Sequence, residues 1–195
     1  MLIAFEGLDQ SGKETQAQHL RARIEQEGRR VHVLSFPDYG TPIGQEIQKA
    51  LAGEREFTPD VMQLLYVANR TEHKQRLTLW MAGDGSVVLC DRYRASSVAY
   101  GEAQGLDPAW LNEIQRHLPA PALTLLLDIA PETAAKRKSS GRDRYERDLA
   151  LLGRVRASYR RQAAEEDWVV IDAARPKDEV SADVAQAVLP RLARL

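Results

Sequence analysis

Five short apolar runs, separated by segments with helical spacing, are the feature that most restricts the folds open to this chain. The runs are Leu2–Phe5, Val31–Leu34, Val87–Cys90, Leu123–Leu127 and Trp168–Ile171. Several are apolar at successive positions instead of alternating, which is typical of strands covered on both faces. Strands that alternate with helices form parallel sheets. The sequence therefore predicts an α/β fold in which helices flank a five-stranded parallel sheet.

Three dipeptides predict where helices begin. Thr41-Pro42, Thr58-Pro59 and Asp107-Pro108 each place a residue that favours the N-cap before a proline. Proline suits the first helical position because that residue has no intrahelical N–H bond to lose.

Composition narrows the class of protein. The net charge of -1 gives no general attraction to nucleic acid or to an anionic membrane. A single cysteine, Cys90, excludes an internal disulfide and suits a reducing compartment. The N-terminal residues resemble a strand and not a secretion signal, and no run approaches the roughly 18 apolar residues that span a bilayer. We expect one cytoplasmic domain over residues 1–195 that binds neither nucleic acid nor membrane.

A phosphate-binding loop follows the first predicted strand. Its residues are Gly7, Leu8, Asp9, Gln10, Ser11, Gly12, Lys13, Glu14 and Thr15. The spacing G-x-x-x-x-G-K is that of a P-loop, in which glycines expose backbone N–H groups to an anion and the lysine reaches terminal phosphates. The sequence thus predicts a fold of the P-loop NTPase type that binds ATP. Glu14 occupies the usual Ser/Thr position, so either Thr15 or other oxygens must contact Mg²⁺.

Charged residues end the third predicted strand. Asp91 and Arg92 directly follow the apolar run, and Tyr93 comes next. Ligands of open α/β sheets gather beyond the carboxyl ends of the strands. These two side chains are therefore expected to meet Mg²⁺ and a phosphate, although a surface ion pair would give the same pattern.

A helix predicted from Thr58 carries a mixed stripe. Met62, Tyr66, Arg70, His73 and Leu77 recur at helical spacing and share one face. A purely structural stripe would be aliphatic, whereas Tyr66 offers a flat face to a base and Arg70 offers donors to a carbonyl or a phosphate. The alternative is a packed aromatic ring beside an arginine that reaches solvent.

A basic segment follows the fourth strand. It spans about residues 136–147 and surrounds a small, flexible centre at Ser139-Ser140-Gly141. Its basic residues are Lys136, Arg137, Lys138, Arg142, Arg144 and Arg147. Arginine matches the charge on a transferring phosphoryl group, so the segment is predicted to be a lid. The competing interpretation is a solvated, charged helix end.

Together these motifs resemble the thymidylate kinase family. The shared features are the Phe-Glu-Gly-Leu-Asp start of the P-loop, Phe36-Pro37 before Thr-Pro-Ile-Gly, Ala68-Asn69-Arg70, Asp91-Arg92-Tyr93, and Arg144-Tyr145-Glu146 after Leu127-Asp128. They follow the family's order over residues 1 to about 147. The last part of the chain resembles nothing specific.

The resemblance implies a role for each matching residue. Lys13 and the loop amides would hold ATP, Arg92 would bridge the donor and acceptor phosphates, and Asp9 would approach the sugar and Mg²⁺. Substrate contacts would come from Pro37, Tyr39, Tyr66, Asn69, Arg70, Ser97, Tyr100 and Glu146. Either Arg142 or Arg144 would close over the phosphoryl group, because Gln10 stands where some relatives have an arginine. Metal contacts would come from Asp9, Thr15 and Asp91.

The implied reaction is Mg²⁺-assisted phosphorylation of dTMP to dTDP by ATP in a homodimeric enzyme. Two alternatives share the P-loop and a charged strand end: a deoxynucleoside kinase, and a kinase of another pyrimidine monophosphate. A third, from a different class, is a non-catalytic P-loop switch, but the sequence lacks the Asn-Lys-x-Asp signature of guanine recognition.

Overall fold

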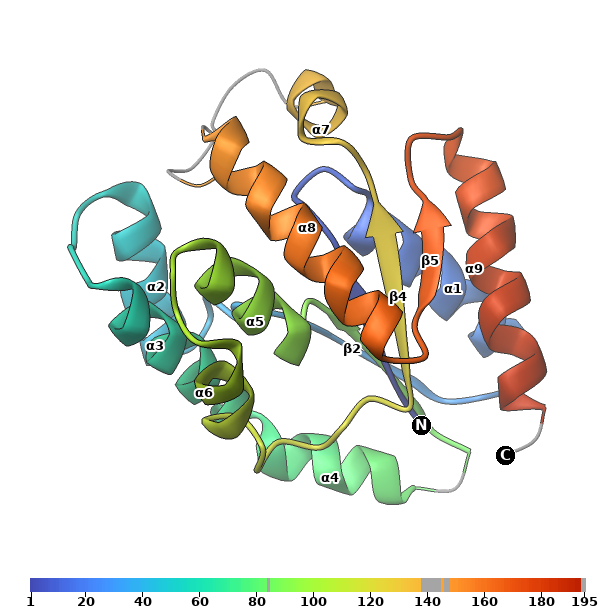
Figure 1. Cartoon of the computed structure of the whole chain (residues 1–195). Helices are drawn as coiled ribbons and strands as arrows, with labels where there is room; N and C mark the ends of the chain where they lie inside the picture. Colours follow the sequence, from blue (N-terminus) through green and yellow to red (C-terminus); the bar gives the residue numbers. More distant parts are fainter. Residues whose placement is uncertain (84, 138–144, 146–147, 194–195) are drawn as a thin grey trace.

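The computed structural model centres on a parallel sheet whose middle strand is the first in sequence (Figure 1). It describes residues 1–83, 85–137, 145 and 148–193. The strands, in the spatial order β2-β3-β1-β4-β5, are β2 (Val31–Ser35), β3 (Val87–Asp91), β1 (Leu2–Glu6), β4 (Leu123–Asp128) and β5 (Val169–Asp172). All neighbouring strands pair in parallel. The prediction of a five-stranded parallel sheet is confirmed.

Helices cover both faces of this sheet (Figure 1). In the described part of the chain they are α1 (Lys13–Gln26), α2 (Pro42–Ala52), α3 (Pro59–Glu72), α4 (Lys74–Ala82), α5 (Arg94–Ala103), α6 (Pro108–Glu113), α7 (Pro131–Arg137), α8 (Leu149–Glu165) and α9 (Lys177–Leu192). One face carries α1 and α9, while α4, α5 and α8 pack on the other. The chain thus forms three layers.

Alternate side chains of β1 enter the two halves of the core. Ile3 and Phe5 pack in the cluster that includes α1, whereas Leu2 and Ala4 pack in the cluster that includes α4. Every residue of β1 is buried, but the edge strands β2 and β5 are partly exposed. Burial on both faces explains why the central strands are apolar at successive positions.

The predicted helix starts are largely confirmed. The Thr41 side chain accepts a hydrogen bond from the Gly44 N–H at 3.0 Å, and Asp107 accepts one from Ala109 at 2.9 Å. Thr58 is the N-cap residue of α3 without such a bond. The prediction of one helix from Thr58 to Leu77 was wrong, because the helix breaks at His73. At this break, the His73 ring nitrogens lie 3.1 Å from the Asp38 carboxylate and 2.6 Å from the Arg76 guanidinium.

The register of the strands brings several loops to one edge of the sheet. Ser35 and Phe5 both lie opposite Asp91, and Asp128 lies opposite Asp172. The carboxyl ends of the strands therefore meet, and the segments after β1, β2 and β3 become neighbours.

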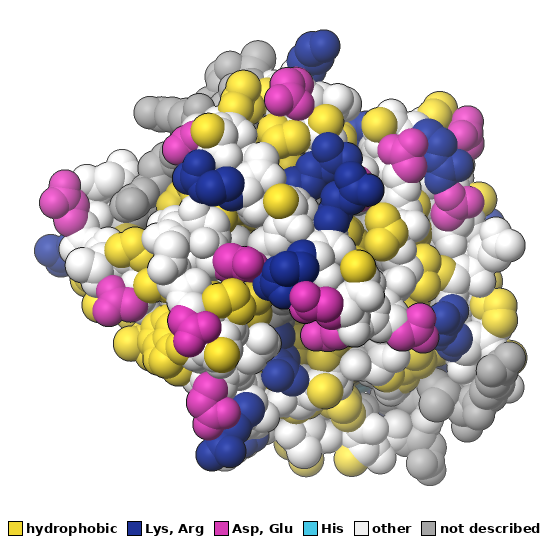
Figure 2. All heavy atoms as spheres, viewed as in Figure 1, with side chains coloured by type: hydrophobic (Ala, Val, Ile, Leu, Met, Phe, Trp, Pro, Cys, Tyr) yellow, Lys and Arg dark blue, Asp and Glu magenta, His cyan; other side chains and the backbone are white. Residues whose placement is uncertain are grey.

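Acidic and basic side chains are interspersed over the face in Figure 2, as the near-zero net charge suggests. Among the described residues, no helix is long and apolar enough to cross a membrane.

Two helical glycines provide a matched test of this packing. A Cβ at Gly44 would lie 1.8 Å from the carbonyl oxygen of Asp38, whereas a Cβ at Gly153 would meet nothing within 4 Å. We expect Gly44→Ala to lower the free energy of unfolding by about 1–3 kcal/mol through overpacking. Gly153→Ala should raise it by about 0.5–1 kcal/mol, because alanine favours a helix. Urea denaturation measures both, and a Gly44→Ala protein as stable as Gly153→Ala would contradict the packing described.

Candidate active site

Glycines shape both ends of the loop after β1. Gly7 has φ 138°, and a Cβ there would lie 2.5 Å from the carbonyl oxygen of Leu127. Gly12 caps α1 with φ 94°. Glycine adopts both conformations at little cost. The loop therefore ends at the amino terminus of α1, where the first N–H groups lack intrahelical partners and favour an anion.

Lys13, the first residue of α1, is buried against this loop. Its ammonium donates to the carbonyl oxygen of Leu8 at 2.8 Å. Burial lowers the pKa of Lys13, and the positive charge of Arg92 lowers it further, whereas Asp91 and Asp9 oppose the shift. An anionic ligand would relieve both unfavourable effects, so the electrostatics of the loop suit a phosphate.

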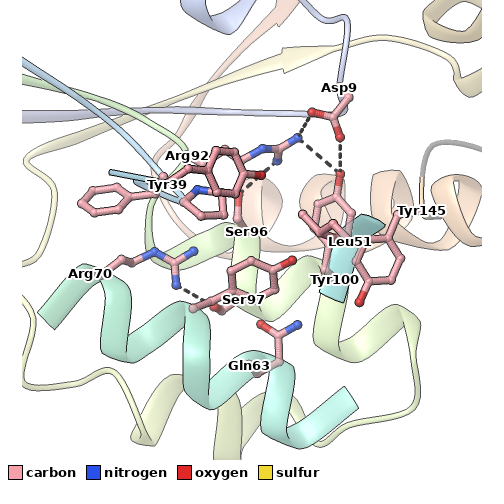
Figure 3. A pocket seen from close by; sticks show the side chains of 13 residues that line it. Asp9, Tyr39, Leu51, Gln63, Arg70, Arg92, Ser96, Ser97, Tyr100 and Tyr145 are labelled. Atoms are coloured by element: carbon pink, nitrogen blue, oxygen red, sulfur yellow. Dashed lines mark hydrogen bonds and ion pairs between the residues drawn. The ribbon is translucent and has the colours of Figure 1, made fainter. Parts of the chain in front are cut away.

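Arg92 joins the end of β3 to the P-loop (Figure 3). One guanidinium nitrogen lies 2.7 Å from the Asp9 carboxylate, and the other donates to the Gly7 carbonyl oxygen at 3.1 Å. Tyr100 completes a triangle, since its hydroxyl donates to Asp9 at 3.2 Å and accepts from Arg92 at 3.3 Å. Burial would raise the pKa of Asp9, but the charges of Arg92 and Lys13 outweigh burial and hold it below its usual range. Asp9 is therefore ionised at neutral pH.

A buried carboxylate that the sequence analysis did not assign supports this triangle. Glu6, the last residue of β1, accepts hydrogen bonds from the backbone N–H groups of Tyr93 and Ser96 at 2.9 and 3.3 Å. Its other oxygen accepts from the hydroxyls of Ser96 at 2.6 Å and Tyr159 at 3.1 Å. Arg92 donates to the same two hydroxyls at 3.3 and 3.2 Å. Glu6 thus fixes the start of α5 and the residues around Arg92.

The backbone is strained at this junction. Arg92 has φ 63° and Gln10 has φ 64°, a left-handed conformation that costs a non-glycine residue about 1 kcal/mol or more. Such strain persists where the surroundings determine the conformation. The hydrogen bonds around Arg92 supply that constraint, and the conformation brings its guanidinium to Asp9.

A pocket opens beside the triangle and encloses about 490 Å³ of empty space, part of it open to solvent. The predicted site residues that line it are Asp9, Pro37, Tyr39, Tyr66, Arg70, Arg92, Ser97 and Tyr100. The other lining residues were not predicted from the sequence; they are Phe36, Leu51, Gln63, Ser96 and Tyr145. Segments 36–39, α3 and α5 therefore converge on one cavity, which has an ion pair at one end (Figure 3).

The other end of the pocket carries a buried arginine. Arg70 of α3 is 3% exposed and donates to the Ser97 hydroxyl of α5 at 2.7 Å. Burial lowers the pKa of Arg70, while the negative charge of Glu6 opposes the shift. The Nε atom has no hydrogen-bond partner among the described residues. Arg70 therefore faces the pocket with donor capacity left over, contrary to the alternative of an arginine that reaches solvent.

Asn69 acts on the pocket through the loop after β2. Its amide oxygen accepts from the backbone N–H of Asp38 at 2.8 Å, and its nitrogen donates to Asp38 and Thr41 at 3.2 and 2.8 Å. Asn69 is fully buried and is not among the residues that line the pocket. It positions the segment that carries Pro37 and Tyr39. A direct contact from Asn69 to a nucleotide stays a prediction.

The predicted metal residues Asp9, Thr15 and Asp91 come from the P-loop, α1 and β3 respectively. Asp91 ends β3, and its Oδ1 atom is buried without a hydrogen-bond partner among the described residues. Thr15 is half-buried in the first turn of α1, whereas Glu14 is exposed. The described residues contain no group of three or more His, Cys, Asp or Glu side chains suited to a metal. Mg²⁺ needs no such cage when phosphates and water complete its coordination, so the residues present fit it.

Most of the predicted lid, including Arg142, Arg144 and Glu146, lies outside the described residues. Arg137, at the end of α7, donates to the carbonyl oxygens of Gln10 at 3.1 Å and Ala173 at 2.7 Å. The start of the basic segment therefore contacts the P-loop. Tyr145 lines the pocket, with its ring centre 5.9 Å from that of Tyr100. Arg137 of the basic segment thus contacts the P-loop, and Tyr145 of the same segment lines the pocket.

Comparison with known proteins identifies the family. The model of the thymidylate kinase family matches residues 5–184. The chain belongs to the thymidylate kinase family. Thymidylate kinases from Dictyostelium discoideum and Arabidopsis thaliana are 34% and 36% identical to it, over 95% and 98% of this chain and 83% and 72% of theirs.

A solved structure supports the same assignment. The thymidylate kinase from Candida albicans superposes with a TM-score of 0.82 at 29% identity, covering 97% of this chain and 91% of its own. The resemblance inferred from the motifs and the prediction of a P-loop NTPase-type fold are thereby confirmed. The family match also extends beyond residue 147, where the motifs gave no signal.

Proposed function

We propose that the chain transfers the γ-phosphoryl group of ATP to the 5′-phosphate of dTMP, giving ADP and dTDP. The family match and the thymidylate kinases among its relatives support this reaction. The observation that carries it is Arg92, which lines the pocket and also bonds Gly7 and Asp9 of the P-loop. A nucleotide held in the pocket would meet ATP on the loop at this guanidinium.

The chemistry needs charge neutralisation more than proton transfer. An oxygen of the acceptor phosphate attacks the γ-phosphorus, and the bond to the β–γ bridging oxygen breaks. A phosphate monoester is largely dianionic at neutral pH, since its second pKa is about 6, so no general base is required. Lys13 and Arg92 hold the phosphates in line and balance the charge of the transition state. Asp91, Asp9 and Thr15 would hold Mg²⁺, which would supply further charge neutralisation.

In this proposal, different walls of the pocket bind different parts of the acceptor. Tyr39 contacts the phosphate, Tyr66 stacks on the base, and Arg70 beside Ser97 donates to a base carbonyl. Tyr100 presses on the sugar and disfavours a 2′-hydroxyl. Each of these side chains lines the same cavity, which supports the assignment.

The proposal also includes a lid and a homodimeric state. Arg142 or Arg144 closes over the phosphoryl group, and Glu146 supports them, within a lid of about residues 136–147. Residues 1–195 act as one nucleoside monophosphate kinase domain. The enzyme is a homodimer. It acts in the cytoplasm, and its single, buried, unpaired cysteine is in keeping with a reducing compartment.

An acceptor panel tests the reaction. Purified protein with ATP and Mg²⁺ should form ADP rapidly with dTMP, and kcat/KM for thymidine should be lower by roughly 10³-fold, because thymidine cannot fill the phosphate contacts. Uridylate and cytidylate serve as the other acceptors. Preference for thymidine would indicate a deoxynucleoside kinase, and preference for uridylate or cytidylate would indicate another monophosphate kinase. ATP binding without any acceptor-dependent turnover would indicate a switch.

Substitution of the phosphate clamps tests the mechanism. Lys13→Ala and Arg92→Ala should each lower kcat by about 100-fold or more, because each removes a charge from the transition state. Circular dichroism and thermal melting establish that the variants are folded. Arg161→Ala is the control, since Arg161 is also 2.7 Å from a carboxylate, that of Glu102, but does not line the pocket. A folded Arg92→Ala enzyme with the kcat of the control would refute the role of Arg92.

A further inference from the structure

Gln63 is a buried polar residue that the fold does not explain. It belongs to α3, is 0% exposed, and neither its amide oxygen nor its amide nitrogen has a hydrogen-bond partner among the described residues. A buried amide without partners costs about 1–3 kcal/mol. Native proteins rarely leave such a group unpaired unless a ligand or a water molecule completes it.

The position of Gln63 indicates which ligand this is. Gln63 lies one turn before Tyr66 and two turns before Arg70, so all three share a face of α3. All three line the acceptor pocket. Figure 3 shows the Gln63 amide projecting from α3 into the pocket, on the side away from Asp9 and Arg92. Arg70 Nε, on the same side of the pocket, is also without a hydrogen-bond partner among the described residues.

We infer that Gln63 hydrogen-bonds the edge of the acceptor's pyrimidine base, an inference that rests on the proposed function. A thymine edge places a ring N–H donor between two carbonyl acceptors. Arg70 can only donate, so it can satisfy a carbonyl but not the ring N–H. The Gln63 amide supplies an acceptor together with donors, which complements the part of the edge that Arg70 cannot match. Gln63 is thus a substrate-binding residue that discriminates by hydrogen bonding.

Gln63→Leu separates this role from a structural one. Leucine removes both unpaired polar atoms at similar size, so the melting temperature of the free protein should stay the same or rise. The dissociation constant for dTMP, measured by isothermal titration calorimetry, should increase by about tenfold or more, because the base edge loses its partner. The dissociation constant for ATP should not change.

Gln115→Leu is the matched control. Gln115 is also fully buried, but its amide nitrogen donates to the Arg94 carbonyl oxygen at 2.9 Å, and it does not line the pocket. This variant should melt at a lower temperature than the wild type and bind dTMP with unchanged affinity. The two substitutions are therefore expected to have opposite effects on stability and on binding.

The outcomes decide between the inference and the proposed function. If the wild type forms dTDP but Gln63→Leu binds dTMP as tightly as the wild type, Gln63 does not contact the base and only this inference fails. A lower melting temperature with unchanged dTMP affinity has the same meaning. If the wild type gives no dTMP-dependent ADP, the proposed function itself fails. Should Gln63→Leu not fold, Gln63→Met is measured in the same way and judged by the same criteria.

Discussion

The buried carboxylate of Glu6 is the interaction on which the site depends. It accepts hydrogen bonds from two backbone N–H groups and two hydroxyls, which come from Tyr93, Ser96 and Tyr159. These bonds connect the end of the central strand to the start of α5 and to α8. Because every oxygen of Glu6 is engaged, the strand end cannot move without breaking several buried hydrogen bonds. The P-loop and Arg92 therefore keep one relative position.

Glu6 also links the two halves of the site electrostatically. Burial lowers the pKa of both Lys13 in the phosphate loop and Arg70 in the acceptor pocket, and the negative charge of Glu6 opposes that shift at both sites. Between the phosphate loop and the acceptor pocket, the Asp9 carboxylate lies 2.7 Å from the Arg92 guanidinium. The cations needed for two anionic ligands are thus held beside acidic groups before either ligand binds, and phosphoryl transfer requires charges positioned in advance in this way.

Sequence alone predicted the parts of the site that depend on local spacing. The apolar runs predicted the sheet, and the glycine spacing predicted the loop that Gly7 and Gly12 form, because strand burial and backbone conformation are local properties. Contacts between elements that are far apart in the sequence could not be predicted in this way. The sequence showed Glu6 only as part of a motif and Gln63 only as one residue of a helix, and the helical spacing gave no sign that the helix ends at His73.

Glu6→Gln is the most direct test of this account, because it keeps the shape of the side chain but puts an N–H donor against the hydroxyls of Ser96 and Tyr159. Single-turnover measurements of phosphoryl transfer to dTMP should show a rate about 10-fold to 100-fold lower, since a small displacement of Arg92 misaligns the phosphates. ATP affinity should change little, because the P-loop glycines remain. A folded Glu6→Gln enzyme that transfers the phosphoryl group at the wild-type rate would contradict the account.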